Sequence, residues 1–135
     1  RTFNHFVTTY DNESNTLNDY TTSQSRFFMK KYIGQEFPDT SLGGLTWGFA
    51  DAIYEGVKDI RRDAGNIKRP TLIFQAQYDS YVHSSGQNTV CDAINVANPN
   101  LCKIKFIKDS KHELLLERDL IRNEVMSNIM DFLVN

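Results

Sequence analysis

The sequence predicts an α/β fold with parallel strands, of which this chain carries only two. The runs TLIFQA (71–76) and KIKFI (103–107) have the length and composition of buried strands. A helical pattern over 84–97 separates them, and a crossover of about twenty-five residues joins parallel strands, because a hairpin needs only a few linking residues. Two strands alone do not make a stable sheet, and residues 1–70 show no convincing further strand. We therefore expect an N-terminal part of the same protein to complete the sheet.

Charge and composition exclude several classes of protein. The chain has 135 residues, with 15 Lys and Arg against 17 Asp and Glu, so its formal charge is −2. This balance argues against a polybasic surface for nucleic acid or anionic lipid. The longest uncharged stretch, 80–91, is polar, so no transmembrane helix is predicted. The chain begins with Arg and has no apolar run near its start, so it opens neither like a native gene product nor like a signal peptide, and we interpret it as a piece of a longer protein.

Two helical patterns precede the strands. The first is expected to begin after a cap at Thr22 or Ser23 and to end before Pro38. The second, over 47–61, has Thr46 as its predicted cap. Its apolar residues recur at spacings of three and four and form one face: Trp47, Ala50, Ile53, Tyr54, Val57 and Ile60.

The helices of the second half follow from similar signals. Ser84 and Gln87 resemble a capping box, which predicts the start of the helix between the strands. A last helix is predicted over 118–134, with Ile121, Val125 and Ile129 on one face.

The cysteines match no zinc pattern, which would need four ligands in closely spaced pairs. Cys91 and Cys102 are therefore predicted to be small buried residues with free thiols. The alternative is a local disulfide, which would need an oxidising compartment or an unusual role.

Two ionisable side chains follow the predicted strands. Asp79 comes three positions after the first strand and His112 five positions after the second. Catalytic groups in open α/β sheets lie at the carboxyl ends of strands, so both residues are expected at one edge of the sheet. A carboxylate beside a histidine is the orienting half of a nucleophile–His–Asp triad. The alternative on spacing alone is a loop Asp and a loop His, both solvated.

Other polar candidates are weaker. His5 and His83 are interpreted as surface or capping residues. Glu113 follows the candidate histidine, but adjacent side chains point apart, which disfavours an acid–base pair. Glu117 and Arg122 are predicted to form a local ion pair or loop anchor.

Aromatic residues in the first half have two interpretations. Phe28 and Trp47 either belong to a core or lid, or line a pocket for an acyl chain. The sequence contains no G-x-S-x-G, G-x-G-x-x-G or Walker motif, so this chain carries no nucleophile elbow.

Two runs, PTLIFQAQYDSYVHSSGQNTVCDAI and KHELLLERDLIRNEVMSNIMDFL, resemble the C-terminal part of α/β-hydrolases. They are most similar to the bacterial lysophospholipase group (L-two type) of the monoacylglycerol-lipase-like branch. In that group the triad acid lies in a QA-x-x-acid context, matched by Gln75, Ala76 and Asp79. The triad histidine is followed by Glu, a Leu-rich turn and E-x-D-x-x-R, matched by His112, Glu113, Glu117, Asp119 and Arg122. TTSQSRF and LGGLTWGF resemble the helical cap of the group.

The resemblance implies a C-terminal fragment of an α/β-hydrolase. Residues 1–66 would form a helical cap or lid segment, and residues 67–135 the C-terminal part of the core with its last two parallel strands and flanking helices. The whole protein would be a serine hydrolase that cleaves carboxylic esters of lysophospholipids or similar monoacyl lipids. Asp79 and His112 would be the acid and base of its triad, and the serine would lie outside this chain. The fragment alone would be inactive, and no cofactor or metal is implied.

Further expectations concern partners and location. The expected partners are a lipid substrate and the N-terminal half of the protein, with peripheral membrane contact and no nucleic acid. The expected location is the cytoplasm or the inner membrane surface of a bacterium. TLIFQA has no charge to protect an open strand edge, so the isolated chain is expected to self-associate. The alternatives are a peptidase-like or small-ester hydrolase of the same fold, and a non-catalytic binding module.

Overall fold

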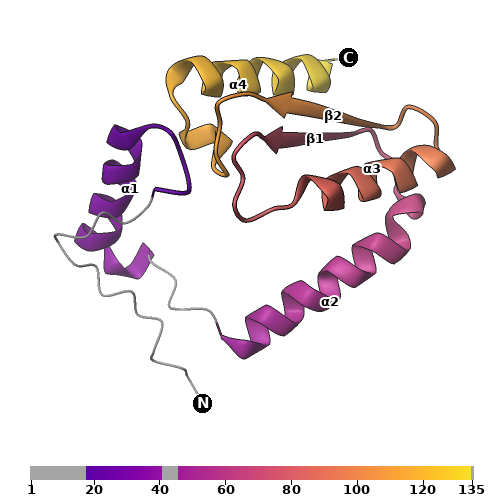
Figure 1. Ribbon diagram of the computed structural model, residues 1–135, viewed down its shortest axis with the longest axis horizontal. Coiled ribbons are helices and arrows are strands. Elements are labelled where there is room, and N and C mark those ends of the chain that lie inside the picture. The colour runs from indigo at the N-terminus through magenta and orange to yellow at the C-terminus, as the bar shows by residue number, and fades with distance from the viewer. Residues whose placement is uncertain (1–17, 41–45, 135) are drawn as a thin grey trace.

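The computed structural model describes residues 18–40 and 46–134, which include a two-stranded parallel sheet between two helices (Figure 1). Strand β1 (Thr71–Ala76) pairs with β2 (Cys102–Ile107) in parallel, with Thr71 opposite Cys102. Helix α3 (Ser84–Ala97) joins the strands and covers one face, and α4 (Asp119–Val134) covers the other. No further strand occurs in the described residues. The predicted parallel pair and the α/β class are therefore confirmed.

Alternation along the strands divides the core into two clusters. On the α3 face the buried residues are Ala64, Cys91, Ile94 and Cys102. On the α4 face they are Ile107, Ile121 and Val125. Successive strand residues point to opposite faces, so Ile73 packs against the first cluster and Phe74 against the second. Both faces of the sheet are thus covered, as a parallel sheet requires.

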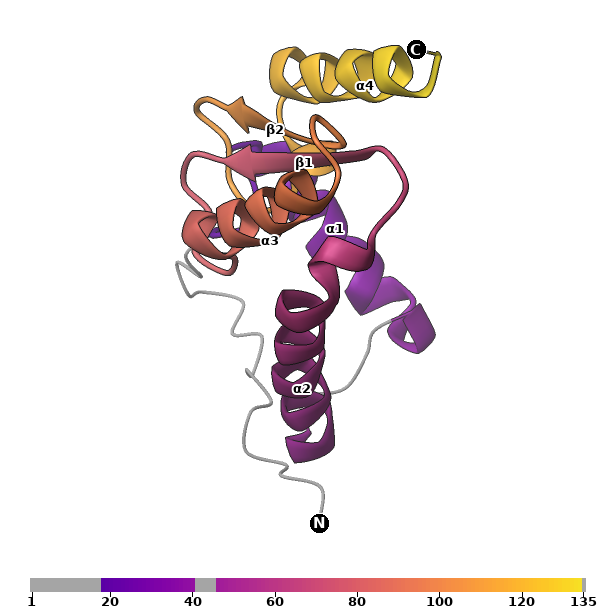
Figure 2. The same cartoon turned by 90° about the vertical axis from the view of Figure 1, so that its right-hand side faces the viewer.

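The helices of the first half lie outside these clusters. Helix α1 (Gln24–Glu36) begins after Ser23, and α2 (Trp47–Asp63) begins after Thr46, whose hydroxyl accepts the N–H of Phe49 at 3.1 Å. The predicted cap at Thr46 is confirmed. Neither helix has a buried residue, and α2 extends away from the sheet (Figure 2). The apolar face of α2 is exposed in this chain. The division of the chain into a cap segment, 1–66, and a core part, 67–135, stays a prediction.

The capping box predicted for α3 is wrong. The residue before the helix is His83, which makes no side-chain capping bond, and Ser84 is already helical. Gln87 does not reach back to the helix start, because its Nε2 donates to the carbonyl oxygen of Phe74 at 3.1 Å. This side chain therefore ties α3 to β1.

Cys91 and Cys102 form a disulfide, so the prediction of free thiols is wrong, although both residues are buried as expected. The path of α3 over β2 brings their Cα atoms to 5.4 Å, within the range that a disulfide requires. Asn95 holds the same crossing, since its side chain accepts the N–H of Cys102 at 2.8 Å and donates to the Cys102 carbonyl at 2.9 Å. The link fixes the helix against the strand that leads to His112.

Removal of this disulfide should destabilise the protein. Replacing Cys91 and Cys102 together with alanine is expected to lower the free energy of unfolding by about 2 to 4 kcal/mol, chiefly because the unfolded chain gains freedom. Urea denaturation of the full-length variant and wild type measures this difference. The native, unreduced protein should also resist thiol alkylation, whereas labelling of both cysteines would contradict the link.

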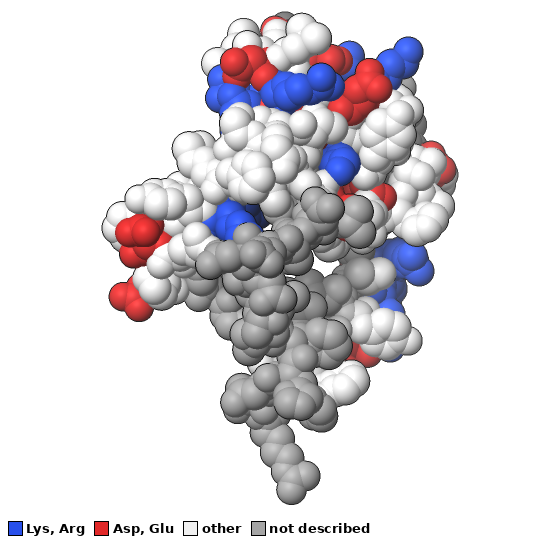
Figure 3. Space-filling view, turned by 60° about the vertical axis from the view of Figure 1, so that its left-hand side comes forward, with Lys and Arg blue, Asp and Glu red and all other residues white. Residues whose placement is uncertain are grey.

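The surface and the helices also bear on membrane association. None of the helices in residues 18–40 and 46–134 is long and apolar enough to cross a membrane. On the face seen in Figure 3, basic and acidic side chains are interspersed over α4 at the top, above a largely uncharged band. Self-association of the isolated chain stays a prediction.

Candidate active site

The loops that follow β1 and β2 are bonded to each other where the strands end. The N–H of Gln77 donates to the carbonyl of Ile107 at 3.1 Å, and the N–H of Tyr78 to that of Ser110 at 2.9 Å. The Gln77 side chain accepts the N–H of Asp109 at 2.8 Å. These bonds place both loops at the carboxyl edge of the sheet, where groups from separate strands can meet.

Asp79 and His112 meet at this edge. The His112 Nδ1 lies 3.0 Å from Oδ1 and 3.1 Å from Oδ2 of Asp79. The structure thus brings together the two side chains that the sequence placed there. Their catalytic role stays a prediction at this point.

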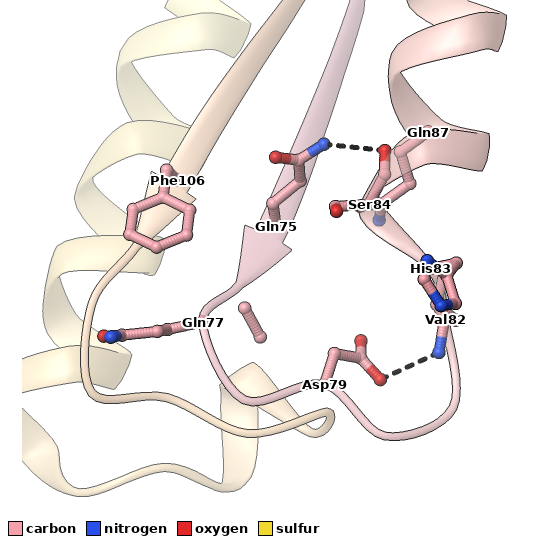
Figure 4. A pocket seen from close by; sticks show the side chains of 9 residues that line it. Gln75, Gln77, Asp79, Val82, His83, Ser84, Gln87 and Phe106 are labelled. Atoms are coloured by element: carbon pink, nitrogen blue, oxygen red, sulfur yellow. Dashed lines mark hydrogen bonds between the residues drawn. The ribbon is translucent and has the colours of Figure 1, made fainter.

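The side chain of Asp79 is held by the backbone of the turn that follows it as well as by His112. The Asp79 side chain is 12% exposed, and Oδ1 accepts the N–H groups of Tyr81 and Val82, each at 2.9 Å. Figure 4 shows the bond from Val82. Burial raises the pKa of Asp79, but the bonds from Val82, His112 and Tyr81 outweigh it and leave the pKa below its ordinary value. Asp79 therefore stabilises the fold above the ordinary aspartate pKa, and this contribution is lost as the pH falls through the folded-state pKa.

The ionised carboxylate determines the form of the imidazole. A carboxylate only accepts hydrogen bonds, so Nδ1 of His112 must carry the proton in the bond to Asp79. In neutral imidazole the other nitrogen, Nε2, then has a free lone pair. The pair is therefore arranged to take up a proton at Nε2 and to stabilise the resulting imidazolium.

An aromatic stack that the sequence did not predict covers His112. The Tyr81 ring lies 4.9 Å from the imidazole at an angle of 48°, and Tyr20 stacks on Tyr81 at 5.2 Å. A hydrogen bond with Tyr20, then burial and the neighbouring acidic groups, raise the pKa of Tyr81 to about 12. Tyr81 is neutral in the physiological range and shields one side of His112. The sequence signal that could have identified Tyr81 is its position two residues after Asp79. A loop aspartate commonly accepts hydrogen bonds from N–H groups just beyond it, which would bring Tyr81 close to the Asp79–His112 pair.

A small pocket reaches Asp79 from the side of α3. It has a volume of about 160 Å³ and its lining residues are Gln75, Ala76, Gln77, Asp79, Val82, His83, Ser84, Gln87 and Phe106 (Figure 4). Pockets for small molecules usually measure about 300–1,000 Å³. This pocket alone is therefore too small for a lipid.

The two aromatic residues predicted to line a substrate pocket lie elsewhere. Phe28 is on α1 beside Phe27, with ring centroids 6.0 Å apart, and is half exposed. Trp47 is the first residue of α2 and is 74% exposed. Neither lines the pocket beside Asp79, and their role toward a substrate stays a prediction.

The positions of His83 and Glu113 agree with the sequence interpretation, which made His83 a surface or capping residue and disfavoured a pair between Glu113 and His112. His83 precedes α3 and lines the pocket, whereas His5 lies outside the described residues. Glu113 forms an ion pair with Lys30 at 3.6 Å rather than a pair with His112.

The ion pair predicted between Glu117 and Arg122 is wrong. Arg122 lies 3.6 Å from Asp119, its neighbour one helical turn away, while the Glu117 carboxylate faces inward to Thr22 and Lys111. Glu117 does anchor a loop, which was the other interpretation of this residue, but its donors are Thr22 and Lys111 rather than Arg122. No group of His, Cys, Asp and Glu within the described ranges could hold a metal ion.

Comparisons with known proteins agree with this architecture. A family model described as serine aminopeptidase, S33 (Hydrolase_4), matches residues 1–119. The chain is 27% identical over 116 residues to a probable lysophospholipase L2 of Haemophilus influenzae, covering 86% of this chain and 36% of that protein. It is 25% identical over 118 residues to lysophospholipase L2 of Escherichia coli K12, covering 86% of this chain and 35% of that one. The chain thus spans about a third of the length of these relatives, and no solved structure matches it. Because the family model matches most of the chain, the protein belongs to the serine aminopeptidase S33 family of α/β-hydrolases.

Proposed function

We propose that the complete protein is a serine hydrolase in which Asp79 and His112 are the acid and base of a Ser–His–Asp triad. The observation that carries this proposal is the contact of 3.0 Å between His112 Nδ1 and Asp79 Oδ1 at the carboxyl edge of two parallel strands. The nucleophilic serine would lie outside this chain, in a part of the complete protein that corresponds to the roughly two thirds of the relatives that this chain does not cover.

The geometry supports a two-step reaction. Nε2 of His112 takes the proton of the serine hydroxyl as its oxygen attacks the ester carbonyl, and then passes that proton to the departing alcohol. In the second step Nε2 takes a proton from water, whose oxygen attacks the acyl-enzyme, and returns the proton to the serine. Asp79 stabilises the imidazolium in both steps while holding Nδ1.

The proposed substrates are carboxylic esters of lysophospholipids or similar monoacyl lipids. Support comes from the names of the relatives, which are lysophospholipases. The exposed apolar side chains of α1 and α2, Phe28 and Trp47 among them, would line the path of the acyl chain once the rest of the protein is in place. The second candidate is removal of an N-terminal amino acid from peptides, which the description of the family favours.

A substrate panel tests the two candidates. The full-length protein is expected to release fatty acid from lysophosphatidylcholine with a kcat/KM at least about tenfold above that for an aminoacyl p-nitroanilide, because only the lipid would use the apolar cap. Residues 1–135 alone should show no turnover, since they carry no G-x-S-x-G elbow. A preference for the p-nitroanilide would favour the peptidase, and binding of lipid without hydrolysis would favour a non-catalytic module.

The disulfide bears on the proposed location. Disulfides persist in oxidising compartments and are rare in the cytosol, so the Cys91–Cys102 link supports a site of action outside the reducing cytoplasm. We therefore favour peripheral contact with a membrane that faces an oxidising compartment, where lysophospholipids would be accessible. This choice keeps the peripheral membrane contact that the sequence analysis expected and departs from its other expectation, the cytoplasm.

A further inference from the structure

Glu117 lies at a junction between the loop that carries His112 and the segment that enters α1. The residue is 0% exposed, although glutamate is rarely buried without partners. Its Oε1 accepts the N–H of Lys111 at 2.7 Å and that of Thr22 at 3.0 Å. Its Oε2 accepts the Thr22 N–H at 3.0 Å and also the Thr22 hydroxyl. Hydrogen bonds from main-chain N–H groups to a carboxylate are among the stronger ones in proteins.

The bond from Lys111 closes a short loop around the candidate base. Lys111 precedes His112, and Glu117 is the residue at which the following 3₁₀ turn, Leu114–Leu116, ends. The carboxylate therefore joins the two ends of the segment that presents the imidazole. Asp79 restrains only the ring of His112, whereas Glu117 restrains the backbone from which the ring projects.

Further bonds connect the same loop to the segment that enters α1. The Thr21 hydroxyl donates to the carbonyl of Leu116 at 2.8 Å, and the N–H of Glu113 donates to the carbonyl of Tyr20 at 2.7 Å. Figure 1 shows this segment beside the loop that precedes α4. Tyr20 in turn stacks on Tyr81, which covers His112. The segment 20–22 and the histidine loop thus form one bonded unit with Glu117 at its centre.

We propose that Glu117 is a positioning residue, which holds the backbone of the His112 loop in register with Asp79 and couples it to the segment that enters α1. The inference rests on the proposed function, because it assigns Glu117 a role through His112. A glutamine at position 117 has the same shape but replaces one acceptor oxygen with an NH₂ donor. That donor would face the N–H groups of Lys111 or Thr22, and the loop would shift away.

The test uses the full-length protein. Glu117→Gln is expected to lower kcat by about 10- to 100-fold with less than about a threefold change in KM, because a small misplacement of a catalytic group costs rate rather than binding. The proton resonance of His112 Nδ1–H should shift or broaden in the same variant. Glu113→Gln is the matched control, since it makes the same change in the same loop at a carboxylate that lies near the surface. Its kcat and its His112 resonance should equal those of the wild type.

A second pair of variants decides the matter if Glu117→Gln does not fold. Thr22→Val removes the hydroxyl that donates to Glu117 and is expected to lower kcat about 3- to 10-fold. Thr22→Ser keeps that donor and should retain at least about half of the wild-type rate. Equal rates for the two Thr22 variants, or an unchanged rate and resonance in Glu117→Gln, would overturn the inference. Full activity of a variant without His112 would instead refute the proposed function. In that case the His112 resonance of the Glu117→Gln variant would still report whether Glu117 positions the ring.

Discussion

Replacing His112 with alanine in the full-length protein is expected to lower kcat/KM for ester hydrolysis by about three to six orders of magnitude. Without the imidazole no group takes the serine proton at Nε2 or returns it to the leaving alcohol. The residual rate would come from substrate binding and from any oxyanion-stabilising groups in the rest of the protein. Initial-rate kinetics on a monoacyl lipid ester measure the effect.

His83 provides the control for this substitution. His83→Ala removes an imidazole of the same chemistry from the same edge of the sheet, where it makes no side-chain capping bond. Its kcat/KM is expected to stay within about tenfold of the wild type. An active His112→Ala protein together with an inactive His83→Ala protein would show that the base had been assigned to the wrong histidine.

Replacing Asp79 with asparagine is expected to lower kcat by about three to four orders of magnitude while the protein stays folded. The amide oxygen can still accept the N–H groups of Tyr81 and Val82, so the turn after β1 should persist. The amide NH₂, however, donates to Nδ1 and stabilises the tautomer whose proton is on Nε2. That tautomer cannot accept the serine proton, and the imidazolium also loses its counter-charge.

Asp109→Asn is the matched control for this loss of charge. Asp109 lies in the neighbouring loop, and its positive φ of 52° is one that asparagine adopts readily. Activity of this variant should equal that of the wild type. A loss of similar size in both variants would mean that the loops tolerate no change of charge, and the Asp79 result would then say nothing about the tautomer.

The sequence predicted the two strands that carry the site, because the composition and length of a short segment largely determine whether it forms a buried strand. The uncharged run TLIFQA ends at the residue where β1 ends, and the length of the crossover required parallel strands. Parallel strands have their carboxyl ends at one edge, which is why the positions of Asp79 and His112 along the chain were enough to place both at that edge. The spacing alone could not distinguish this pair from two solvated loop residues.

Two of the contacts that the sequence did not predict depend on how separate segments cross. Cys91 and Cys102 bond because of the angle at which α3 passes over β2, and no local pattern encodes that angle. Glu117 was assigned to Arg122 because the two are close in sequence, whereas its donors include Thr22, which is 95 positions away. Residues 18–22 have no hydrophobic period, so nothing in their sequence indicated that they would bind the histidine loop.

The most direct test is a crystal structure of the full-length protein after reaction with a fluorophosphonate, whose serine adduct mimics the tetrahedral intermediate of ester hydrolysis. We expect the phosphorus on a serine upstream of this chain, with His112 Nε2 within about 3 Å of the serine oxygen or of a phosphonyl oxygen. Asp79 should remain bonded to Nδ1 in that structure. An adduct beyond the reach of His112, or one whose serine is paired with another histidine, would contradict the assignment of the Asp79–His112 pair as the catalytic acid and base.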